Sequence, residues 1–581
     1  MKKQIFWKVF NRWPFFSELF VNGLFILLFA MRAIHQLPAF IPASVANTVI
    51  DTLGVLAPVV ILFTLLGNLY HSANLEIFLR NYVFSIIVFV PMVVTYGDLE
   101  FTFWLSSAHL LSSILALYDP KETRTWRPAA SVKWMNKIHL SAAQILFFSF
   151  LVVIILGGLL LMLPVAVQDG VAPLKAVDAF FLATSATTVT GLTPFTISTH
   201  MSTFGQMVLL ALVQIGGLGI MTFSASLAIL LGKGIDIREK LLMQDLLGAE
   251  AMEDVSPIIF DILRYALVIE AWGAIVLTVA FTMDGMDLGQ ALYFGIFHGI
   301  SAFCNAGLCL FDSSLQNYGT NPLIAGTVAV MIFLGGLGFI TLKEVKEIIT
   351  RKRRLSNLSL NSKVVLTVSL SIIAVGTVFI FFSEFLNGLD GLGVGDKLQI
   401  ALFQAVSVRT AGFTTIDFAS FHPQVLYVFI WFMAIGAGPG STGGGIKTTT
   451  FAILVSSITS TLKGRKQVQL FHRVIPNELV VRSIALTFIY LAIALVFIFI
   501  LMLTEQDKSF LAILFEVVSA EGTVGASIGL TGDLTRIGKF VISILMFIGR
   551  IGPLTLVLAI GQHHDSDDGA VTYPEGRIMI G

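Results

Sequence analysis

FLATSATTVTGL, residues 181–192, is a short apolar segment that breaks at a glycine between two longer hydrophobic spans. The same pattern recurs three times, and each copy is too short to cross a bilayer and must turn back. The copies are FHGISAFCNAGL (297–308), FQAVSVRTAGF (403–413) and FEVVSAEGTVGA (515–526). In a bilayer, interrupted backbone is tolerated only where it is buried in protein or lines a watery cavity. Four matched interruptions therefore indicate one shared polar site, and an ion pore is the natural product of such a repeat.

The internal spacing of the four repeats is nearly constant. In each repeat a Phe precedes a Ser by four residues, and in the first, second and fourth repeats the glycine follows that Ser by six residues. In the third repeat the glycine follows by five, so that repeat is one residue tighter. The glycines are Gly191, Gly307, Gly412 and Gly525.

Composition excludes most other classes of protein. Hydrophobic residues make up 56% of the 581 residues and charged residues only 12%, whereas ordinary soluble domains carry about 25% charged residues. This composition predicts a polytopic membrane protein surrounded by lipid. The 36 basic and 36 acidic residues balance, so global charge predicts no nucleic-acid partner. Cys304 and Cys309 are too few for a disulfide framework and lack metal-type spacing.

We predict an all-α fold of twelve membrane spans, because about 20 apolar residues cross the hydrocarbon core as a helix. The spans lie near 16–36, 47–69, 80–97, 99–118, 140–164, 204–231, 257–283, 322–342, 363–386, 424–455, 478–503 and 537–560. The predicted domains are a four-helix extension (1–118), a cytosolic basic linker (119–139), pore units at 140–238, 239–354, 355–465 and 466–570, and a C-terminal tail (571–581).

The distribution of Lys and Arg predicts the orientation. Residues 118–139 hold five basic side chains and residues 343–363 hold seven, whereas 283–321 holds no Lys or Arg and three acids. Basic loops remain on the cytosolic side of a membrane. We therefore expect the N-terminus and the basic loops inside, and the four glycine breaks facing outside.

The strand beyond each short helix is the predicted selectivity filter. A short helix that stops inside the membrane points its C-terminal carbonyls at the pore centre, and a following strand can replace a cation's hydration shell with carbonyl oxygens. Glycine reaches the dihedrals that this requires. No rigid carboxylate ring for a divalent ion is present, so monovalent cations fit best. The candidate cation-binding residues are Thr188, Val189, Thr190 and Gly191; Cys304, Asn305, Ala306 and Gly307; Arg409, Thr410, Ala411 and Gly412; and Gly522, Thr523, Val524 and Gly525.

Two of the filter segments carry a charged residue. Arg409 and Glu521 either pair behind the filter or serve as its scaffold, and scaffolding is favoured because an Arg facing the pore would repel the cation. The acids Glu270 and Glu384 lie in spans. They either shape an outer or buried site or are solvated, and solvation is favoured because single carboxylates near helix ends are usually solvated.

The third repeat contains the candidate gate. In GAGPGSTGGGIKTTT (436–450), six glycines and a proline within ten residues preclude a regular helix. The span 424–455 should therefore break and leave a mobile loop below the filter. Arg550 lies in an apolar span, where a charge is costly and usually functional; it either forms the inner barrier with this loop or extends to the inner surface. The candidate gate residues are Gly436, Gly438, Pro439, Gly440, Ser441, Thr442, Gly443, Gly444, Gly445, Lys447 and Arg550.

Other functions find less support. Gly438, Gly440 and Gly443 match a dinucleotide fingerprint, but the flanking segments are membrane spans, so no organic cofactor is expected. The histidines are scattered without a paired metal-ligand pattern, which argues against an enzyme. A proton- or sodium-coupled symporter is the alternative, because broken helices also build transporter sites; those folds typically use inverted repeats, whereas these four share one orientation.

The chain resembles the Trk, Ktr and HKT superfamily of potassium and sodium transporters, and most closely the Ktr-type membrane subunit. Seven motifs carry the resemblance, from about position 140 to the end, and in chain order they are TVTGL, SAFCNAGL, VRTAGF, GPGSTGGGIKTTTF, GTVGAS, GRIGPLT and YPEGRIMIG. The four spans before position 118 have no counterpart in the short Ktr subunits. Cys304 and Glu521 stand where Asn and an apolar residue are expected.

The resemblance implies four pseudo-symmetric helix, pore-helix, helix units around one pore. It also implies a homodimer in the plasma membrane, the inner membrane of a bacterial cell, in contact with lipid. A cytosolic ring of nucleotide-binding regulatory subunits of the RCK or KTN type would lie beneath it. The family assigns the filter to the four glycines and the gate to the loop around Gly438 to Gly445, with Arg550 as its partner. Glycine in the first loop resembles potassium-conducting members, so the passing ion is expected to be potassium, with sodium as the alternative.

Overall fold

The computed structural model describes residues 142–219, 255–351 and 355–552, together with short helical pieces at 21–22, 24–25, 49–54, 56–57, 60–61 and residue 106. The chain divides into two compact regions, Met1–His139 and Leu140–Gly581. The predicted four-helix extension is described only at those short pieces. The predicted linker 119–139 and tail 571–581 lie outside the described residues.

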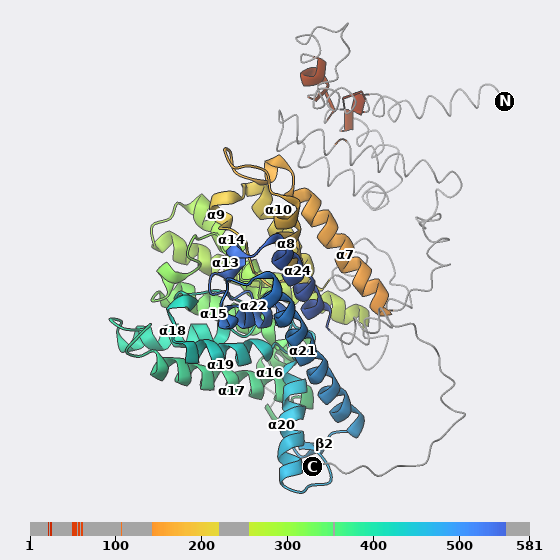
Figure 1. The fold of residues 1–581 in the computed structure, drawn as a ribbon, viewed down its shortest axis with the longest axis vertical. Helices are drawn as coiled ribbons and strands as arrows, with labels where there is room; N and C mark the ends of the chain where they lie inside the picture. Colours follow the sequence, from red (N-terminus) through yellow and green to blue (C-terminus); the bar gives the residue numbers. More distant parts are fainter. Residues whose placement is uncertain are drawn as a thin grey trace, which may run out of the picture. The chain divides into compact units, whose positions relative to one another are not determined.

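The described part of the second region is mostly helical with almost no strand (Figure 1), which confirms the predicted all-α class. Each repeat contains a first helix, a short helix and one or two further helices. In order these are α7 (Ala142–Leu161), α8 (Ala176–Thr187) and α10 (Thr203–Leu218); α13 (Val255–Met283), α14 (Leu288–Phe303) and α15 (Pro322–Leu337); α17 (Leu360–Ser383), α18 (Val394–Ser407), α19 (Pro423–Ala434) and α20 (Thr448–Leu462); and α21 (Asn477–Thr504), α22 (Phe510–Glu521) and α24 (Arg536–Ile551). The fourfold pseudo-symmetry of these units stays a prediction.

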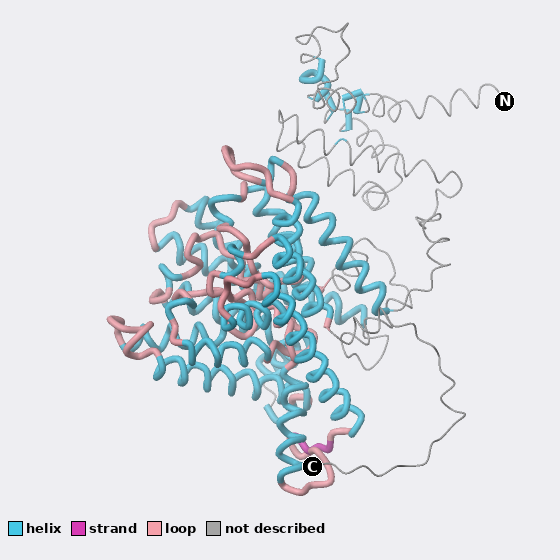
Figure 2. Tube along the Cα trace, viewed as in Figure 1, coloured by secondary structure: helices cyan, strands magenta, loops and turns pink. Residues whose placement is uncertain are grey.

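Smaller elements connect these helices. They are η1 (Pro164–Ala166), α9 (Ile197–His200), η3 (Gln316–Tyr318), α16 (Phe339–Arg351), η4 (Leu355–Asn357), η5 (Phe418–Ser420) and α23 (Leu530–Asp533). An antiparallel pair, β1 (Gln469–Leu470) and β2 (Arg473–Val474), pairs Gln469 with Val474 and Leu470 with Arg473. Figure 2 shows loop segments in the middle of the helical region as well as at its ends.

Three of the described helices are long and apolar enough to cross a membrane: Asp261–Met283, Leu360–Ser383 and Asn477–Thr504. The short helices α8, α14, α18 and α22 have 12 to 16 residues, below the roughly 20 that a crossing needs. They are re-entrant candidates, as the sequence pattern predicted.

The predicted continuous span at 322–342 is wrong. Helix α15 ends at Leu337, and α16 leaves it at an angle of 110°. Gly338 joins them with a φ of +87°, a left-handed conformation that glycine adopts without a Cβ penalty. Gly219 and Gly552 end α10 and α24 in the same way, with φ of +81° and +89°. Helices α10 and α24 thus end within the predicted spans 204–231 and 537–560, whose remaining residues lie outside the described part of the chain.

The starts of several helices are fixed by local side-chain caps. Ser202, Ser509 and Thr535 each accept a hydrogen bond from a backbone N–H in the first turn of α10, α22 and α24. Such caps satisfy amide donors that have no intrahelical partner. Each helix therefore begins where the sequence supplies a hydroxyl.

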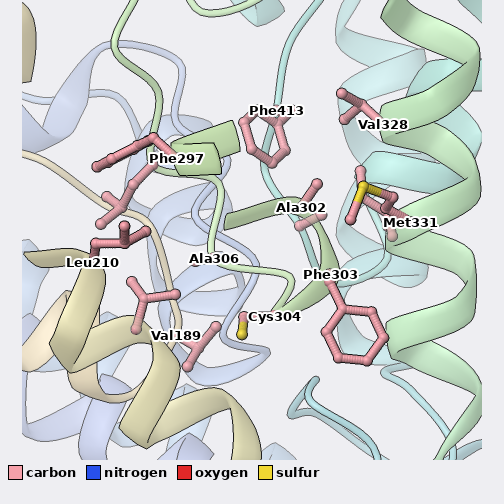
Figure 3. Close-up of a cluster of buried hydrophobic side chains, with 14 of the residues drawn as sticks. Val189, Leu210, Phe297, Ala302, Phe303, Cys304, Ala306, Val328, Met331 and Phe413 are labelled. Carbon is pink, nitrogen blue, oxygen red and sulfur yellow. The ribbon is translucent and has the colours of Figure 1, made fainter. Parts of the chain in front are cut away.

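The short helices form the centre of the core. The repeated Phe side chains are fully buried, at Phe181, Phe297, Phe403 and Phe515. Figure 3 shows Phe297, Cys304 and Val189 in one cluster, although Val189 comes from the first repeat and the other two from the second. The core thus joins separate repeats around the ends of their short helices.

Candidate functional site

A repeated hydrogen bond turns the chain after each short helix. The carbonyl oxygen of the repeated Ser accepts from the backbone N–H five residues later in all four repeats. The pairs and N···O distances are Ser185 with Thr190 (2.8 Å), Ser301 with Ala306 (2.8 Å), Ser407 with Gly412 (3.1 Å) and Ser519 with Val524 (2.8 Å). The bonded residue precedes the glycine in three repeats and is the glycine itself in the third. The turn thus keeps its five-residue length in the third repeat, and the glycine takes the place of the residue that precedes it in the other repeats.

The four glycines have left-handed backbone conformations, with φ of +95° at Gly191, +67° at Gly307, +71° at Gly412 and +82° at Gly525. Two residues earlier, Val189, Asn305 and Thr523 also have positive φ, near +55°. The tighter third repeat has no such residue in its segment. Positive φ in non-glycine residues is uncommon and is retained where the surroundings enforce it.

The four glycines form a closed ring. A Cβ atom added at Gly191 would overlap the carbonyl oxygen of Ala306, and one at Gly307 would overlap that of Ala411. One at Gly412 would overlap the carbonyl oxygen of Val524, and one at Gly525 would overlap that of Thr190. Each glycine thus packs against the residue before the glycine of the next repeat, and the fourth closes on the first. The structure brings the predicted filter segments together; their role in cation binding stays a prediction.

The side chains next to the ring also connect repeats. Asn305 and Thr410 are hydrogen-bonded through their side chains at 3.0 Å, in either orientation of the amide. Thr188 and Thr190 share a hydroxyl hydrogen bond of 2.8 Å within the first repeat. The buried bond between Asn305 and Thr410 holds the second and third segments together, and the bond between Thr188 and Thr190 stabilises the first segment internally.

A second set of glycines begins the repeated clusters of QIGGLGIMTF, FLGGLGFITL and FIGRIGPLTL, for which the sequence favours close helix packing. These glycines position the short helices. A Cβ added at Gly216 would overlap the carbonyl oxygen of Thr187, the last residue of α8. A Cβ added at Gly335 would likewise overlap the carbonyl oxygen of Phe303, at the end of α14. One added at Gly549 would overlap the carbonyl oxygen of Glu521, at the end of α22. The last glycine of each G-x-x-G motif then ends its helix. The recurrence of this motif at 216–219, 335–338 and 549–552 was the available signal.

The loop between α19 and α20 is the predicted gating loop, and the span 424–455 breaks there as predicted. Its two ends are tied together, because Gly436 donates to Ile446 O (2.9 Å) and Ile446 donates to Ala434 O (3.1 Å). Lys447 Nζ donates to Gly443 O at 2.7 Å. The loop is therefore a compact closed segment in this structure.

The loop docks on the broken end of α15. Its backbone N–H groups at Gly438 and Thr442 donate to Gly336 O (2.9 Å) and Gly335 O (3.3 Å), and Phe339 N–H donates to Gly440 O (3.1 Å). The last carbonyls of a helix have no intrahelical partner, and here the loop supplies their donors. The end of α15 at Gly338 thus exposes the carbonyls to which the loop binds, so the helix break and the position of the loop depend on each other.

Other repeats hold the loop from the remaining sides. Gly444 N–H donates to Thr523 Oγ1 in the fourth filter segment at 3.0 Å. Arg550 donates through Nη1 to Thr442 O and through Nη2 to Gly216 O, a last-turn carbonyl of α10. The guanidinium thus binds protein carbonyls instead of extending to the inner surface. The predicted contact between Arg550 and the loop is present, and its gating role stays a prediction.

The less favoured alternative, a pairing of Arg409 with Glu521, is wrong. Arg409 Nη2 donates to Ser369 Oγ (3.2 Å) and to Gly436 O (3.4 Å), so the side chain connects the third filter segment to α17 and the loop. Both carboxylate oxygens of Glu521 lack a hydrogen-bond partner among the described residues. The favoured scaffold role describes Arg409, and Glu521 is a buried carboxylate without a hydrogen-bond partner among the described residues.

The expectation that Glu270 and Glu384 are solvated is also wrong. Glu270 lies inside α13, is 5% exposed, and accepts from Gln214 Nε2 at 3.0 and 3.1 Å. Cys304 Sγ lies 3.9 Å from Glu270 Oε1. Glu384 is fully buried at the end of α17 and accepts from Asn387 and from the backbone of Gly388 and His422. Both carboxylates are tied into the packing, because a buried charge without such partners is costly.

Four re-entrant helices that end at a closed glycine ring inside an apolar helical shell define a class, the membrane proteins that move ions through protein-lined breaks in the backbone. Within that class the chain belongs to the TrkH family of cation transport proteins, whose family model matches residues 133–569. It is therefore a cation transporter of the membrane and not an enzyme.

Individual relatives agree with this assignment. The Ktr system potassium uptake protein B of Bacillus subtilis is 38% identical over 452 residues, covering 78% of this chain and 98% of the relative. The potassium/sodium uptake protein NtpJ of Enterococcus hirae is 36% identical, covering 76% and 98%. The crystal structure of the potassium transporter TrkH from Vibrio parahaemolyticus matches with a TM-score of 0.56 at 19% identity, covering 88% of this chain and 97% of that one. This last likeness concerns the fold.

Proposed function

We propose that the chain takes up potassium through a pore whose selectivity filter is the ring of Gly191, Gly307, Gly412 and Gly525. The observation that carries this proposal is the closure of the ring, in which each glycine packs on the next repeat and the fourth on the first. Relatives named for potassium uptake support potassium as the ion, and NtpJ, named for potassium and sodium, keeps sodium as the alternative.

The short helices supply the electrostatics of the proposed pore. The carboxyl end of a helix carries a partial negative charge, and the four short helices end immediately before the ring segments. Glycines of the following helices allow close packing at three of these ends. A cation at the ring axis would then lie at the focus of four negative helix ends, without a carboxylate that would hold a divalent ion.

The proposed gate is the loop Gly436–Lys447 with Arg550. The loop binds α15 of the second repeat and both the filter segment and Arg550 of the fourth, so its position depends on two other repeats at once. Loss of the Arg550 bonds would free the loop on one side while leaving the ring segments in place. When the pore opens, the loop would move away and its backbone groups would form hydrogen bonds with water in place of those with the protein.

The assembly in the cell belongs to the same proposal. We infer a homodimer in the plasma membrane with the N-terminus on the cytosolic side, as the distribution of Lys and Arg predicts. A cytosolic nucleotide-binding subunit of the RCK or KTN type would regulate it. The name of the Bacillus relative, a protein of the Ktr system, supports a multi-component assembly.

The test is ion flux through the purified chain in liposomes with potassium or sodium as the sole cation. The pore predicts potassium flux that persists when no proton or sodium gradient is imposed. A strict requirement for either gradient would instead identify a coupled symporter, and absence of flux for both cations would contradict the proposal.

A further inference from the structure

A polar residue follows the repeated Phe in three of the four short helices, and each one reaches across to the strand beyond the ring. These residues are His298, Gln404 and Glu516, and each is fully buried. Their partners are Cys309, Thr415 and Ser527, with donor–acceptor distances of 3.2, 3.3 and 2.8 Å. In every case the partner lies eleven residues after the helix residue.

The second repeat uses a histidine as an acceptor. His298 Nδ1 lies 2.7 Å from Phe294 O, which as a carbonyl can only accept, so the ring proton is on Nδ1. Nε2 therefore accepts, from the Cys309 thiol and from the backbone N–H of Leu310 at 3.3 Å. One imidazole thus binds two consecutive residues of the strand.

The third and fourth repeats use a carboxamide and a carboxylate. Gln404 Nε2 donates to Thr415 Oγ1. Glu516 accepts from Ser527 Oγ through one oxygen and from Thr531 Oγ1 through the other. Three different functional groups make the same connection, which indicates that the connection itself is what the repeats share.

The eleven-residue spacing survives a change elsewhere in the repeat. The partner lies two residues after Gly307 and Gly525 but three residues after Gly412. The residue missing before the glycine in the third repeat is thus offset by one after it. This compensation keeps the helix and the outgoing strand in the same register at the contact.

The first repeat lacks the connection. The equivalent residues are Leu182, which is apolar and buried, and Thr193, and no hydrogen bond joins their side chains. In the first repeat a shorter connection takes its place, because Ser185 Oγ on the short helix accepts from the backbone N–H of Gly191 at 3.0 Å. The eleven-residue connection to the segment beyond the ring is therefore present in three repeats and absent from the first.

We propose that His298, Gln404 and Glu516 are positioning residues that hold the outgoing strands against the short helices and thereby set the discrimination between monovalent cations. The inference rests on the proposed filter. Discrimination by carbonyl oxygens depends on the size of the site and on how the oxygens are held. A buried hydrogen bond close to the ring restrains both, since each connected residue is only two or three positions from a ring glycine.

The test is the ratio of potassium to sodium flux in liposomes for single and double variants of one connection. Gln404→Leu and Thr415→Val each remove one side of the bond, and Thr415→Val retains the shape of the side chain. Each single change should lower the ratio by about fivefold, the factor that one net hydrogen bond is worth. The double variant should lower it no further than a single one, because both remove the same bond.

The fourth repeat supplies a conservative comparison. Glu516→Gln should preserve the ratio, since Gln performs this role in the third repeat, whereas Ser527→Ala should lower it. Leu182→Met in the first repeat is the matched control at the equivalent position and should leave the ratio unchanged.

The outcomes separate this inference from the function on which it rests. A native chain without selective flux overturns the proposed function. A selective native chain whose Thr415→Val and Ser527→Ala variants have the native ratio overturns the positioning role alone. Additive effects of Gln404→Leu and Thr415→Val would overturn it as well, because independent losses do not identify a shared bond.

Discussion

Gly525 of the fourth repeat packs against the carbonyl oxygen of Thr190 in the first, leaving no room for a Cβ atom between them. These residues are more than 330 positions apart in the sequence, and their contact is the one that closes the ring. Every other contact of the ring joins consecutive repeats. The structural basis of the site is therefore a cyclic arrangement that no single repeat can form.

Packing at the ends of the short helices predicts opposite effects for two glycines of α15. Gly335→Ala places a methyl group on the carbonyl oxygen of Phe303, whereas nothing lies within 4 Å of a Cβ added at Gly326. We expect Gly335→Ala to destabilise the protein by about 1–3 kcal/mol, as overpacking does. Gly326→Ala should be neutral or stabilising by up to about 1 kcal/mol. Thermal unfolding in detergent compares the two, and equal midpoints would contradict the packing described.

Removal of the Arg550 guanidinium should open the proposed gate. Arg550→Gln loses the bonds to Thr442 O and Gly216 O that hold the loop and the end of α10. We expect higher flux with an unchanged preference for potassium, and deletion within 437–445 should act in the same direction. Lys539→Gln is the control, because Lys539 lies on the same helix but pairs with Asp178 at 2.7 Å. Lower flux in Arg550→Gln would argue that this side chain is needed to hold the pore open.

The two buried acids of α22 should respond oppositely to an apolar substitution. Glu521 has no hydrogen-bond partner among the described residues, whereas Glu516 accepts from two hydroxyls. Glu521→Leu should therefore stabilise the protein, since an unsatisfied buried polar group costs about 1–3 kcal/mol. Glu516→Leu should destabilise it by a similar amount, because it leaves Ser527 and Thr531 unsatisfied. The measurement is the unfolding midpoint of each variant at one pH and salt concentration. Destabilisation by Glu521→Leu as well as by Glu516→Leu would contradict the prediction, because it would mean that the Glu521 carboxylate has a stabilising partner.

The local features of the site could be predicted from the sequence. Each glycine break interrupts a hydrophobic pattern, and its backbone requirement is local, so the four ring glycines were predictable one by one. The break in the third repeat was predictable for the same reason, because glycines and a proline preclude a helix there. The contact of Arg550 with the loop was also anticipated, since a charge in an apolar span needs polar partners.

Features that depend on tertiary contacts were not predictable. The hydrophobic pattern of 322–342 runs unbroken through Gly338, and only the docked loop shows why the helix ends there. Arg409 and Glu521 have complementary charges, but Arg409 bonds to Ser369 and Gly436 and Glu521 has no hydrogen-bond partner among the described residues. Glu270 and Glu384 were expected in solvent because burial depends on neighbouring helices, which hydropathy along one segment does not encode.

The central claim is that the glycine ring selects potassium, and Gly191→Ser tests it most directly. Gly191 has a φ of +95° and no space for a Cβ atom next to the carbonyl oxygen of Ala306. The substitution therefore distorts the ring where the first repeat contacts the second. The measurement is potassium and sodium flux through the native and substituted chains in liposomes. The native chain should prefer potassium strongly, and Gly191→Ser should reduce that preference by about tenfold, equivalent to ~1.4 kcal/mol. Identical potassium preference in the two proteins would contradict the assignment of the filter.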